Sequence, residues 1–460
     1  MAPGILAAFA SVLIVSGGSR GDGLLVGGGF LPWRGVPYAS PVAVGDPVPP
    51  PVGAHPLGLW PSGNARGSIP LRPASLAEVW NAYPQELAGI EGRLVRRVQL
   101  STDDVEAFFL LSVTYGRMYA AGEGEAMLSS AARLATHLLE LAPGDPRGMM
   151  AIAEVLIRTG NDAAARDFLA EWARRHGDDS WFYALETALL DLRETGDVSA
   201  FLGRGDEIAA LPGADRAVIA GSAASVVGAG CEAASPETRA GWAEQVSGSW
   251  LLHRDVHYLV ADGYIKYTLG RYADAARVYR EALRVDPGNK QAMFLNAIIV
   301  GHELGNPRSG LRAIERVKAK YWEGLDRYQR ATLLAYGASY LARLGKVDEA
   351  VREFSDALGT LPDVEFEVEA LLVLKEALVA KSKSPKIFVE IVGGVSDRVG
   401  ASAARLVMMA KVIHNHLKDP LRAAAVLNDA ILIGAAGGGD VDSIRKLRSQ
   451  ILGEEALEAP

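Results

Sequence analysis

Cysteine is almost absent from this chain of 460 residues, which contains only Cys231. A single thiol can form neither an internal disulfide framework nor a cysteine-based zinc site. Its neighbours, Gly-Ala-Gly before it and Glu after it, offer no positive charge that would activate a thiolate. We therefore expect Cys231 to be a small structural residue rather than a reactive one.

An excess of positive charge is also missing. The chain has 47 Lys and Arg residues against 55 Asp and Glu residues, which gives a net charge of −8. Proteins that bind nucleic acids usually carry a basic surface, because neutralisation of phosphates supplies much of their affinity. We therefore expect no nucleic acid among the partners.

Apolar runs long enough to cross a membrane are lacking. The uncharged run at residues 3–15 is shorter than the roughly 20 residues that a transmembrane helix needs. Its length, and the small residues at 16–18, are typical of a signal peptide, although no Lys or Arg precedes Arg20. We expect residues 1–18 to be a signal-like segment; a misassigned start and a buried apolar segment are the alternatives.

Residues 19–75 are rich in Gly and Pro, which disfavour both helices and central strands. We predict an irregular, extended arm here. It carries four aromatic residues that a purely solvating linker would not need: Phe30, Trp33, Tyr38 and Trp60. Either they pack on the rest of the chain or they bind a partner, because an extended Pro-rich peptide loses little entropy on binding.

From residue 76 onward, apolar residues recur at intervals of three and four, which predicts helices. Residues 269–287 and 344–362 repeat one another, with Gly, Ala, an aromatic residue, Ala and Pro at the same offsets. These residues are Gly270, Ala275, Tyr279, Ala282 and Pro287 in the first segment, and Gly345, Ala350, Phe354, Ala357 and Pro362 in the second. Gly263 and Ala338 occupy equivalent positions in the preceding helices.

This pattern resembles the tetratricopeptide repeat, a helix–turn–helix unit of about 34 residues. The resemblance implies that Gly forms the turn, that Ala allows two helices to approach closely, and that the aromatic residue wedges between repeats. Weaker copies have expected turns near Gly122 and Gly124, Gly160, Gly196, Ser235, Gly305, Pro385 and Pro420. The resemblance therefore implies an all-α fold, a right-handed α-solenoid of about eight to nine helical hairpins over residues 76–433.

The last part of the chain is expected to close this array. Residues 434–439 are rich in Gly and predict a linker, and residues 441–453 predict a charged helix followed by a short tail to residue 460. A solenoid needs such a polar cap, because its terminal repeat would otherwise expose an apolar face.

Signatures of catalysis are lacking as well. We find no phosphate-binding loop, nucleophile elbow or kinase motif. Asp103 and Asp104 stand at a predicted helix start, where negatively charged side chains interact favourably with the helix dipole. His253 and His257 are four apart, but without a metalloprotease motif we expect them to lie on a helix surface. We predict no catalytic residue, no cofactor and no metal ion.

In tetratricopeptide proteins, the first helices of the repeats line a concave groove that binds partners. The resemblance places His257, Val260, Tyr264 and Tyr267 at such positions in the clearest repeat, although these tyrosines could instead fill the space between helices. The subclass that clamps a terminal carboxylate uses Lys and Asn where Val260 and Tyr264 stand here, so that mode of binding is not expected.

These observations predict a non-catalytic scaffold whose partners are other proteins, with the groove and the N-terminal arm as contact surfaces. With the signal-like segment, they indicate a component of an assembly in a bacterial envelope, located in the periplasm and close to a membrane. A cytosolic adaptor or co-chaperone is the main alternative. A helical-repeat protein that binds RNA is another, because pentatricopeptide repeats have a similar length, but the acidic composition, Pro287 and Pro362 favour protein partners.

Overall fold

The computed structural model describes residues 74–453 except positions 83, 121, 179, 232, 233, 326, 438 and 439. These residues form 21 α-helices and a few short 3-10 or π segments, with no strand among them. The predicted all-α fold is thereby confirmed. The signal-like segment at 1–18 and the arm residues Phe30, Trp33, Tyr38 and Trp60 lie outside the described residues.

The described chain divides into two compact units, which we call unit 1, residues 74–269, and unit 2, residues 270–453. From α4 to α21, first and second helices alternate along the chain, so these 18 helices make nine pairs, in agreement with the predicted eight to nine. The boundary between the units falls between α12 and α13. Helices that could span a membrane are not found in the part of the chain that the structure describes.

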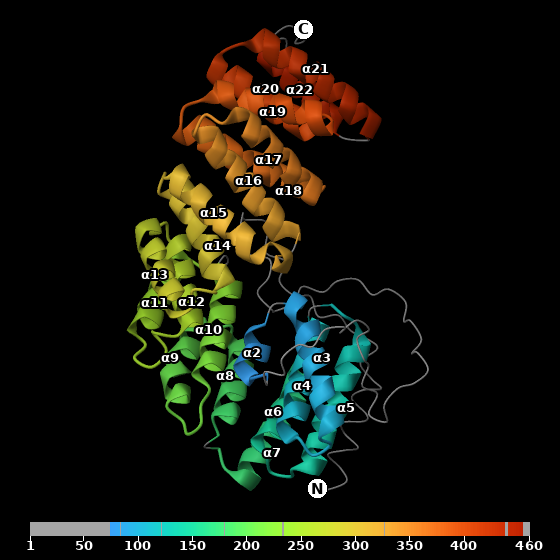
Figure 1. Ribbon diagram of the computed structural model, residues 1–460, viewed down its shortest axis with the longest axis vertical. Helices are drawn as coiled ribbons and strands as arrows, with labels where there is room; N and C mark the ends of the chain where they lie inside the picture. The colour runs from blue at the N-terminus through green and yellow to red at the C-terminus, as the bar shows by residue number, and fades with distance from the viewer. Residues whose placement is uncertain are drawn as a thin grey trace, which may run out of the picture. The chain divides into compact units, whose positions relative to one another are not determined.

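In unit 1, most consecutive helices pack against each other, and so do the first helices α4 and α6, α6 and α8, and α10 and α12 (Figure 1). For example, α4 contacts both α5 and α6, and α6 contacts both α7 and α8. Such nearest-neighbour packing is typical of a solenoid. The helices are α2 (Leu76–Asn81), α3 (Pro84–Leu100), α4 (Val105–Ala120), α5 (Glu125–Leu141), α6 (Pro146–Arg158), α7 (Asp162–His176), α8 (Trp181–Thr195), α9 (Val198–Ala209), α10 (Arg216–Gly230), α11 (Pro236–Gly248) and α12 (Val256–Thr268).

Unit 2 continues the alternation: α16 contacts α17 and α18, and α18 contacts α20. Three of its first helices end in a π turn, and the next helix then begins with Pro, which suits a first helical position. Its elements are α13 (Tyr272–Val285), α14 (Lys290–Ile298), η1 (Ile299–Glu303), α15 (Pro307–Tyr321), η2 (Trp322–Gly324), α16 (Arg327–Arg343), α17 (Val347–Thr360), α18 (Val364–Lys375), η3 (Glu376–Lys381), α19 (Pro385–Val399), α20 (Ala403–Val412), η4 (Ile413–Leu417), α21 (Pro420–Gly437) and α22 (Val441–Leu452).

The turn glycines have the backbone conformation that the repeat requires. Gly160, Gly196, Gly270, Gly305 and Gly345 all have φ between +69° and +78°, a left-handed region that other residues adopt only at a cost. The remaining residues of the motif pack as expected: Ala275, Tyr279 and Ala282, and likewise Ala350, Phe354 and Ala357, are 0% exposed.

The boundary predicted near the C-terminus needs a correction. Residues 434–437, which the sequence placed in a linker, form the last turn of α21. Gly434 faces Val441 and Ile444 of α22, where an added Cβ would lie 3.5 Å and 3.6 Å from their side chains. These are ordinary van der Waals distances, so the packing of α22 leaves room for a side chain here, and the helix continues through the favourable helix residues Ala435 and Ala436.

Candidate functional site

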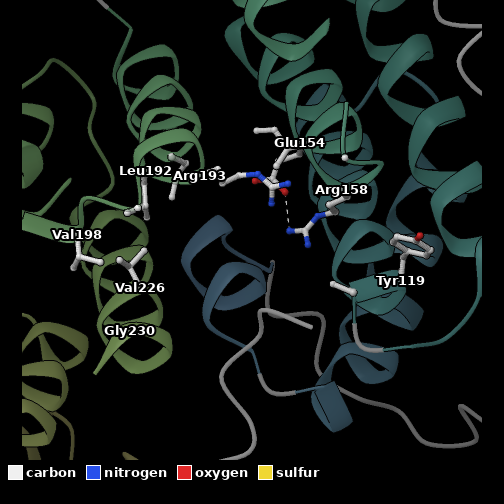
Figure 2. Close-up of a pocket in the computed structure, with 13 residues that line it drawn as sticks. Tyr119, Glu154, Arg158, Leu192, Arg193, Val198, Val226 and Gly230 are labelled. Carbon is white, nitrogen blue, oxygen red and sulfur yellow. Dashed lines mark ion pairs between the residues drawn. The ribbon is translucent and has the colours of Figure 1, made fainter. Parts of the chain in front are cut away.

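The first helices of unit 1 together form a pocket of about 550 Å³ (Figure 2). Tyr119 of α4, Glu154 of α6, Leu189 of α8 and Val226 of α10 line it, at successive intervals of 35, 35 and 37 residues. Equivalent positions of consecutive repeats therefore build the pocket. Its apolar wall consists of Ile157, Leu189, Leu192, Val198 and Val226, and its polar residues are Tyr119, Glu154, Arg158 and Arg193.

An ion pair lies at the polar side of this pocket. Nη2 of Arg158 lies 2.7 Å from Oε2 of Glu154, one turn earlier on α6, and their side chains are 15% and 9% exposed. Gly116 of α4 makes room for the guanidinium, because a Cβ there would lie 3.2 Å from Nε of Arg158. Burial limits the competition of water with this pair, so it is held more firmly than an exposed pair would be.

A second carboxyl group, that of Glu186 on α8, lies deeper and is 0% exposed. Neither of its oxygens has a hydrogen-bond partner among the described residues. Burial raises the pKa of Glu186 well above its usual range; the negative charge of Glu154 adds to this rise, and the positive charge of Arg158 opposes it. Glu186 precedes Leu189 by three positions, so the two side chains lie on neighbouring parts of one helix face.

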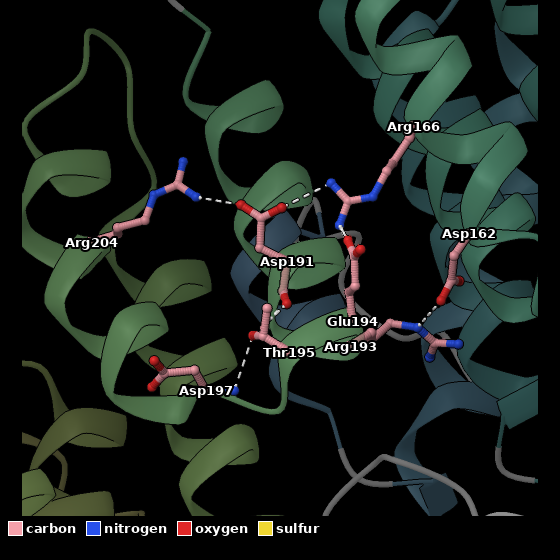
Figure 3. Close-up of polar contacts among 8 residues, drawn as sticks. All are labelled: Asp162, Arg166, Asp191, Arg193, Glu194, Thr195, Asp197 and Arg204. Carbon is pink, nitrogen blue, oxygen red and sulfur yellow. Dashed lines mark hydrogen bonds and ion pairs between the residues drawn. The ribbon is translucent and has the colours of Figure 1, made fainter.

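The position of α8 is supported by a network of charged residues on three helices (Figure 3). Asp191 of α8 pairs with Arg166 of α7 at 2.8 Å and with Arg204 of α9 at 3.1 Å. Arg193 of α8, which also lines the pocket, pairs with Asp162 of α7 at 2.9 Å. Each exposed pair contributes little alone, but a carboxylate shared by two neighbouring helices fixes the alignment of α8 between them.

A short helix, α2, lies across the same first helices, in contact with α4 and α10 (Figure 1). Nε1 of Trp80 donates a hydrogen bond to Oγ of Ser222 on α10 at 3.0 Å, and Nδ2 of Asn81 donates to the carbonyl of Ala217 at 3.1 Å. Ser222 precedes the pocket residue Val226 by one helical turn. The groove of unit 1, defined as the surface of α4, α6, α8 and α10 that carries these residues, thus holds α2 beside the open pocket.

Two family models match parts of this chain. One, described as a tetratricopeptide repeat, matches residues 124–189, and the other, described as the Fis1 C-terminal tetratricopeptide repeat, matches residues 254–301. The chain contains tetratricopeptide repeats. Such repeats bind other proteins, so the chain is a scaffold for protein–protein interaction. No curated protein matches the sequence.

Solved structures with related helical arrangements are distant in sequence. A tetratricopeptide repeat protein from Parabacteroides merdae is 13% identical, with 66% of this chain and 97% of that chain covered and a TM-score of 0.31. A human IFIT1 dimer with m7Gppp-AAAA is 13% identical, with 79% of this chain and 74% of that chain covered and a TM-score of 0.34. Yeast Tom70 is 12% identical, with 82% of this chain and 96% of that chain covered and a TM-score of 0.22. These scores are low, and nothing about the function of this chain rests on them.

The four residues that the resemblance to tetratricopeptide repeats predicted to bind a partner lie on α12. Val260 and Tyr264 are 2% and 5% exposed, while His257 and Tyr267 are half-buried. None of the four lines the pocket of unit 1. Their contact with a partner stays a prediction, and so does that of the arm residues Phe30, Trp33, Tyr38 and Trp60. His253 precedes α12, so it does not share a helix face with His257.

The sequence did not single out the residues that the structure brings together in this groove. Glu154 and Arg158 could have been found from their spacing of four on a predicted first helix, which is typical of an ion pair. Trp80 stands at the start of the helical region, where an aromatic residue is a signal of packing. Nothing local distinguishes Ser222 or Glu186 from other polar residues on predicted helices.

One group of possible metal ligands lies in unit 2: His302, Glu303 and Glu376. The ammonium of Lys381 lies 3.0 Å from a carboxylate oxygen of Glu303 and 3.0 Å from one of Glu376, and it donates to the carbonyl of His302 at 3.2 Å. The ammonium of Lys381 is thus paired with both carboxylates, so the cluster is explained as an ion-pair network. Burial, together with Lys381, lowers the pKa of His302, which favours the neutral imidazole.

Proposed function

We propose that the groove of unit 1 is the surface through which this scaffold binds a segment of another protein. The observation that carries the proposal is the pocket itself, to which four consecutive first helices contribute equivalent positions. An apolar wall beside an ion pair and a further arginine suits an amphipathic helix, which buries one face and leaves the other to polar contacts. The pocket has room for a few side chains rather than for a whole domain.

The charges around the pocket favour a protein partner over RNA. Its two arginines are both paired, Arg158 with Glu154 and Arg193 with Asp162. Backbone phosphates need unpaired positive charge, because their neutralisation supplies most of the affinity. A cytosolic adaptor or co-chaperone would use the same groove, so the groove does not distinguish it from a component of an envelope assembly.

We propose that the chain acts in a bacterial envelope, as part of a larger assembly next to a membrane. The support is the signal-like composition of residues 1–18 and the Pro-rich arm that follows. Fractionation of the native host, with mass spectrometry of the protein's N-terminal peptide, should find it in the envelope with an N-terminus after about residue 18. Recovery in the cytosol with Met1 intact would replace this proposal by the adaptor.

The binding surface is tested by placing a charge in the apolar wall. We expect Leu192→Asp to weaken capture of the partner about tenfold or more, because an aspartate in the pocket loses its hydration against an apolar helix face. Leu192 is only half-buried, so the fold should tolerate the change. The measurement is quantitative affinity capture from the native host with tagged wild-type and variant proteins.

Leu100→Asp is the matched control for this experiment. Leu100 ends α3 in the same unit, is 75% exposed and does not line the pocket. A protein that is captured by the wild type and by Leu100→Asp, but not by Leu192→Asp, would be the groove's partner. Equal capture by all three proteins would contradict the proposed surface.

A further inference from the structure

Helix α2 meets the groove through three kinds of specific contact. The first is the indole of Trp80, whose N–H is bonded to Ser222 and whose side chain is 8% exposed. The second is the carboxamide of Asn81, bonded to a main-chain carbonyl of α10. The third is Arg117 of α4, which donates to the carbonyls of Val79 at 3.1 Å and Ala82 at 2.7 Å.

The third contact recognises the end of a helix. The last carbonyls of any helix lack partners within it, and the helix dipole makes them attractive to a cation. Arg117, itself 6% exposed, supplies both the charge and the donors at that end of α2. Because main-chain carbonyls accept these bonds, any short helix that ends in this place would satisfy Arg117 equally well.

We propose that α2 is an internal ligand of the groove, which a partner helix of the same chemistry displaces. That partner helix carries an indole followed by a carboxamide near its C-terminal end and directs its last carbonyls at Arg117. The proposal rests on the proposed function and deepens it, because it names the kind of segment that the groove recognises and the step that must precede binding.

The size of α2 suits a segment that leaves its place. It has six residues, and isolated helices much shorter than about 12 residues are unstable in water, so the groove itself maintains this one. Of these residues only Val79 and Trp80 are buried. Ala74 and Ala82, on either side of the helix, are also buried, and the remaining contacts are polar and include an ion pair between Glu78 and Arg93 of α3. Water can replace polar contacts of this kind when the segment dissociates.

Two residues of α10, Gly221 and Ser222, shape the groove for this ligand. Gly221 of α10 leaves space for Asn81, because an added Cβ would lie 1.8 Å from Oδ1 of that carboxamide. Ser222 also donates a hydrogen bond to the carbonyl of Val218 at 3.0 Å, so its hydroxyl keeps a partner when Trp80 leaves. After α2 leaves, the surface would therefore offer the hydroxyl oxygen of Ser222 as an acceptor for an indole N–H. It would also offer the space beside Gly221 for a carboxamide, and the guanidinium of Arg117 as a donor to helix carbonyls.

Covalent attachment makes α2 a strong competitor. A tethered segment acts at an effective concentration in the millimolar range, so a free partner helix binds weakly until α2 is loosened. A peptide of residues 74–82 supplied in trans should accordingly bind the full-length Trp80→Ala variant about tenfold or more tightly than the wild type. Trp80→Ala weakens the internal ligand but leaves every residue of the groove in place.

The displacement of α2 is measured directly by amide hydrogen exchange of residues 74–82 in the full-length protein. Gly221→Ala should accelerate this exchange about tenfold or more, because the methyl group removes the space for Asn81 and the bond to Ala217. The same change favours α10 as a helix, so loss of folding does not explain the result. Asn81→Ala removes the overlapping atoms, and the double variant should therefore exchange no faster than Asn81→Ala alone.

The outcomes separate this proposal from the function on which it rests. Exchange of residues 74–82 that stays as slow as that of α4 in Gly221→Ala, together with no binding of the peptide by Trp80→Ala, would show that α2 is a permanent part of unit 1. A partner lost on Leu192→Asp would in that case still establish the groove as the binding surface. The converse result is a peptide that binds the single variant Trp80→Ala but not the double variant that also carries Arg117→Met. That result would support the proposal that α2 is an internal ligand, even if capture of no partner depends on Leu192.

Discussion

Phe354→Ala is expected to lower the free energy of unfolding of unit 2 by about 3–5 kcal/mol. Phe354 is the large aromatic residue of the second motif copy and is 0% exposed. It belongs to a continuous buried cluster that includes Leu334, Leu374 and Phe388 from the surrounding helices. Truncation removes the buried ring and leaves a cavity that the packed helices cannot close.

The measurement is denaturant unfolding followed by circular dichroism, and two further variants frame it. Val364→Ala in the same unit is the control: Val364 is 70% exposed, so its loss should change stability by no more than about 0.5 kcal/mol. Phe354→Leu keeps most of the buried volume and should fall between the two. Equal stability of Phe354→Ala and Val364→Ala would contradict the role of the aromatic residue as the wedge of the repeat.

Glu186→Leu is expected to raise the free energy of unfolding of unit 1 by about 1–3 kcal/mol at pH 8. The carboxyl of Glu186 is 0% exposed and lacks hydrogen-bond partners among the described residues, so the folded chain holds a polar group that water solvates in the unfolded chain. Leucine has a similar size and needs no partner.

The gain should depend on pH with a definite sign. The pKa of Glu186 is raised in the folded state, so between its ordinary value of about 4.3 and the raised value the folded chain binds more protons than the unfolded chain. Stability of the wild type therefore falls as the pH rises through this interval. Thermal unfolding at pH 5 and pH 8 should show a larger gain for Glu186→Leu at pH 8.

Glu207→Leu is the matched control for Glu186→Leu. Glu207 is an exposed carboxylate on α9 in the same unit, so its replacement should show no comparable gain at either pH. If Glu186→Leu were destabilising at pH 8, the buried carboxyl would have a stabilising partner that the described residues do not reveal, and our account of its environment would be wrong.

The repeat was predictable because its structural demands are local. A left-handed turn requires Gly, which identified Gly160, Gly196, Gly270, Gly305 and Gly345 in advance. Close approach of two helices requires Ala, and a fixed offset then places the buried aromatic residue. Each demand is met within some 20 residues, so one sequence suffices to recognise it even in degenerate copies.

The groove and its occupant were not predictable in the same way. Trp80 and Ser222 are 142 positions apart, and no local pattern connects them. A glutamate on a first helix, such as Glu186, has the same sequence signature whether it is solvated or buried. The predicted linker at 434–437 was wrong because this Gly-containing run still forms the last turn of α21, with Ala435 and Ala436 as favourable helix residues and α22 packed against the helix.

Photo-crosslinking from the pocket tests the central claim most directly. A photoreactive phenylalanine analogue is placed at Leu192 in the full-length protein, in its native host, and at Leu100 as the control for an exposed position of the same unit. We predict a covalent adduct with another protein from position 192 and none from position 100. Adducts with another protein from position 100 but none from position 192 would contradict the claim that the groove of unit 1 is where this scaffold binds its partner.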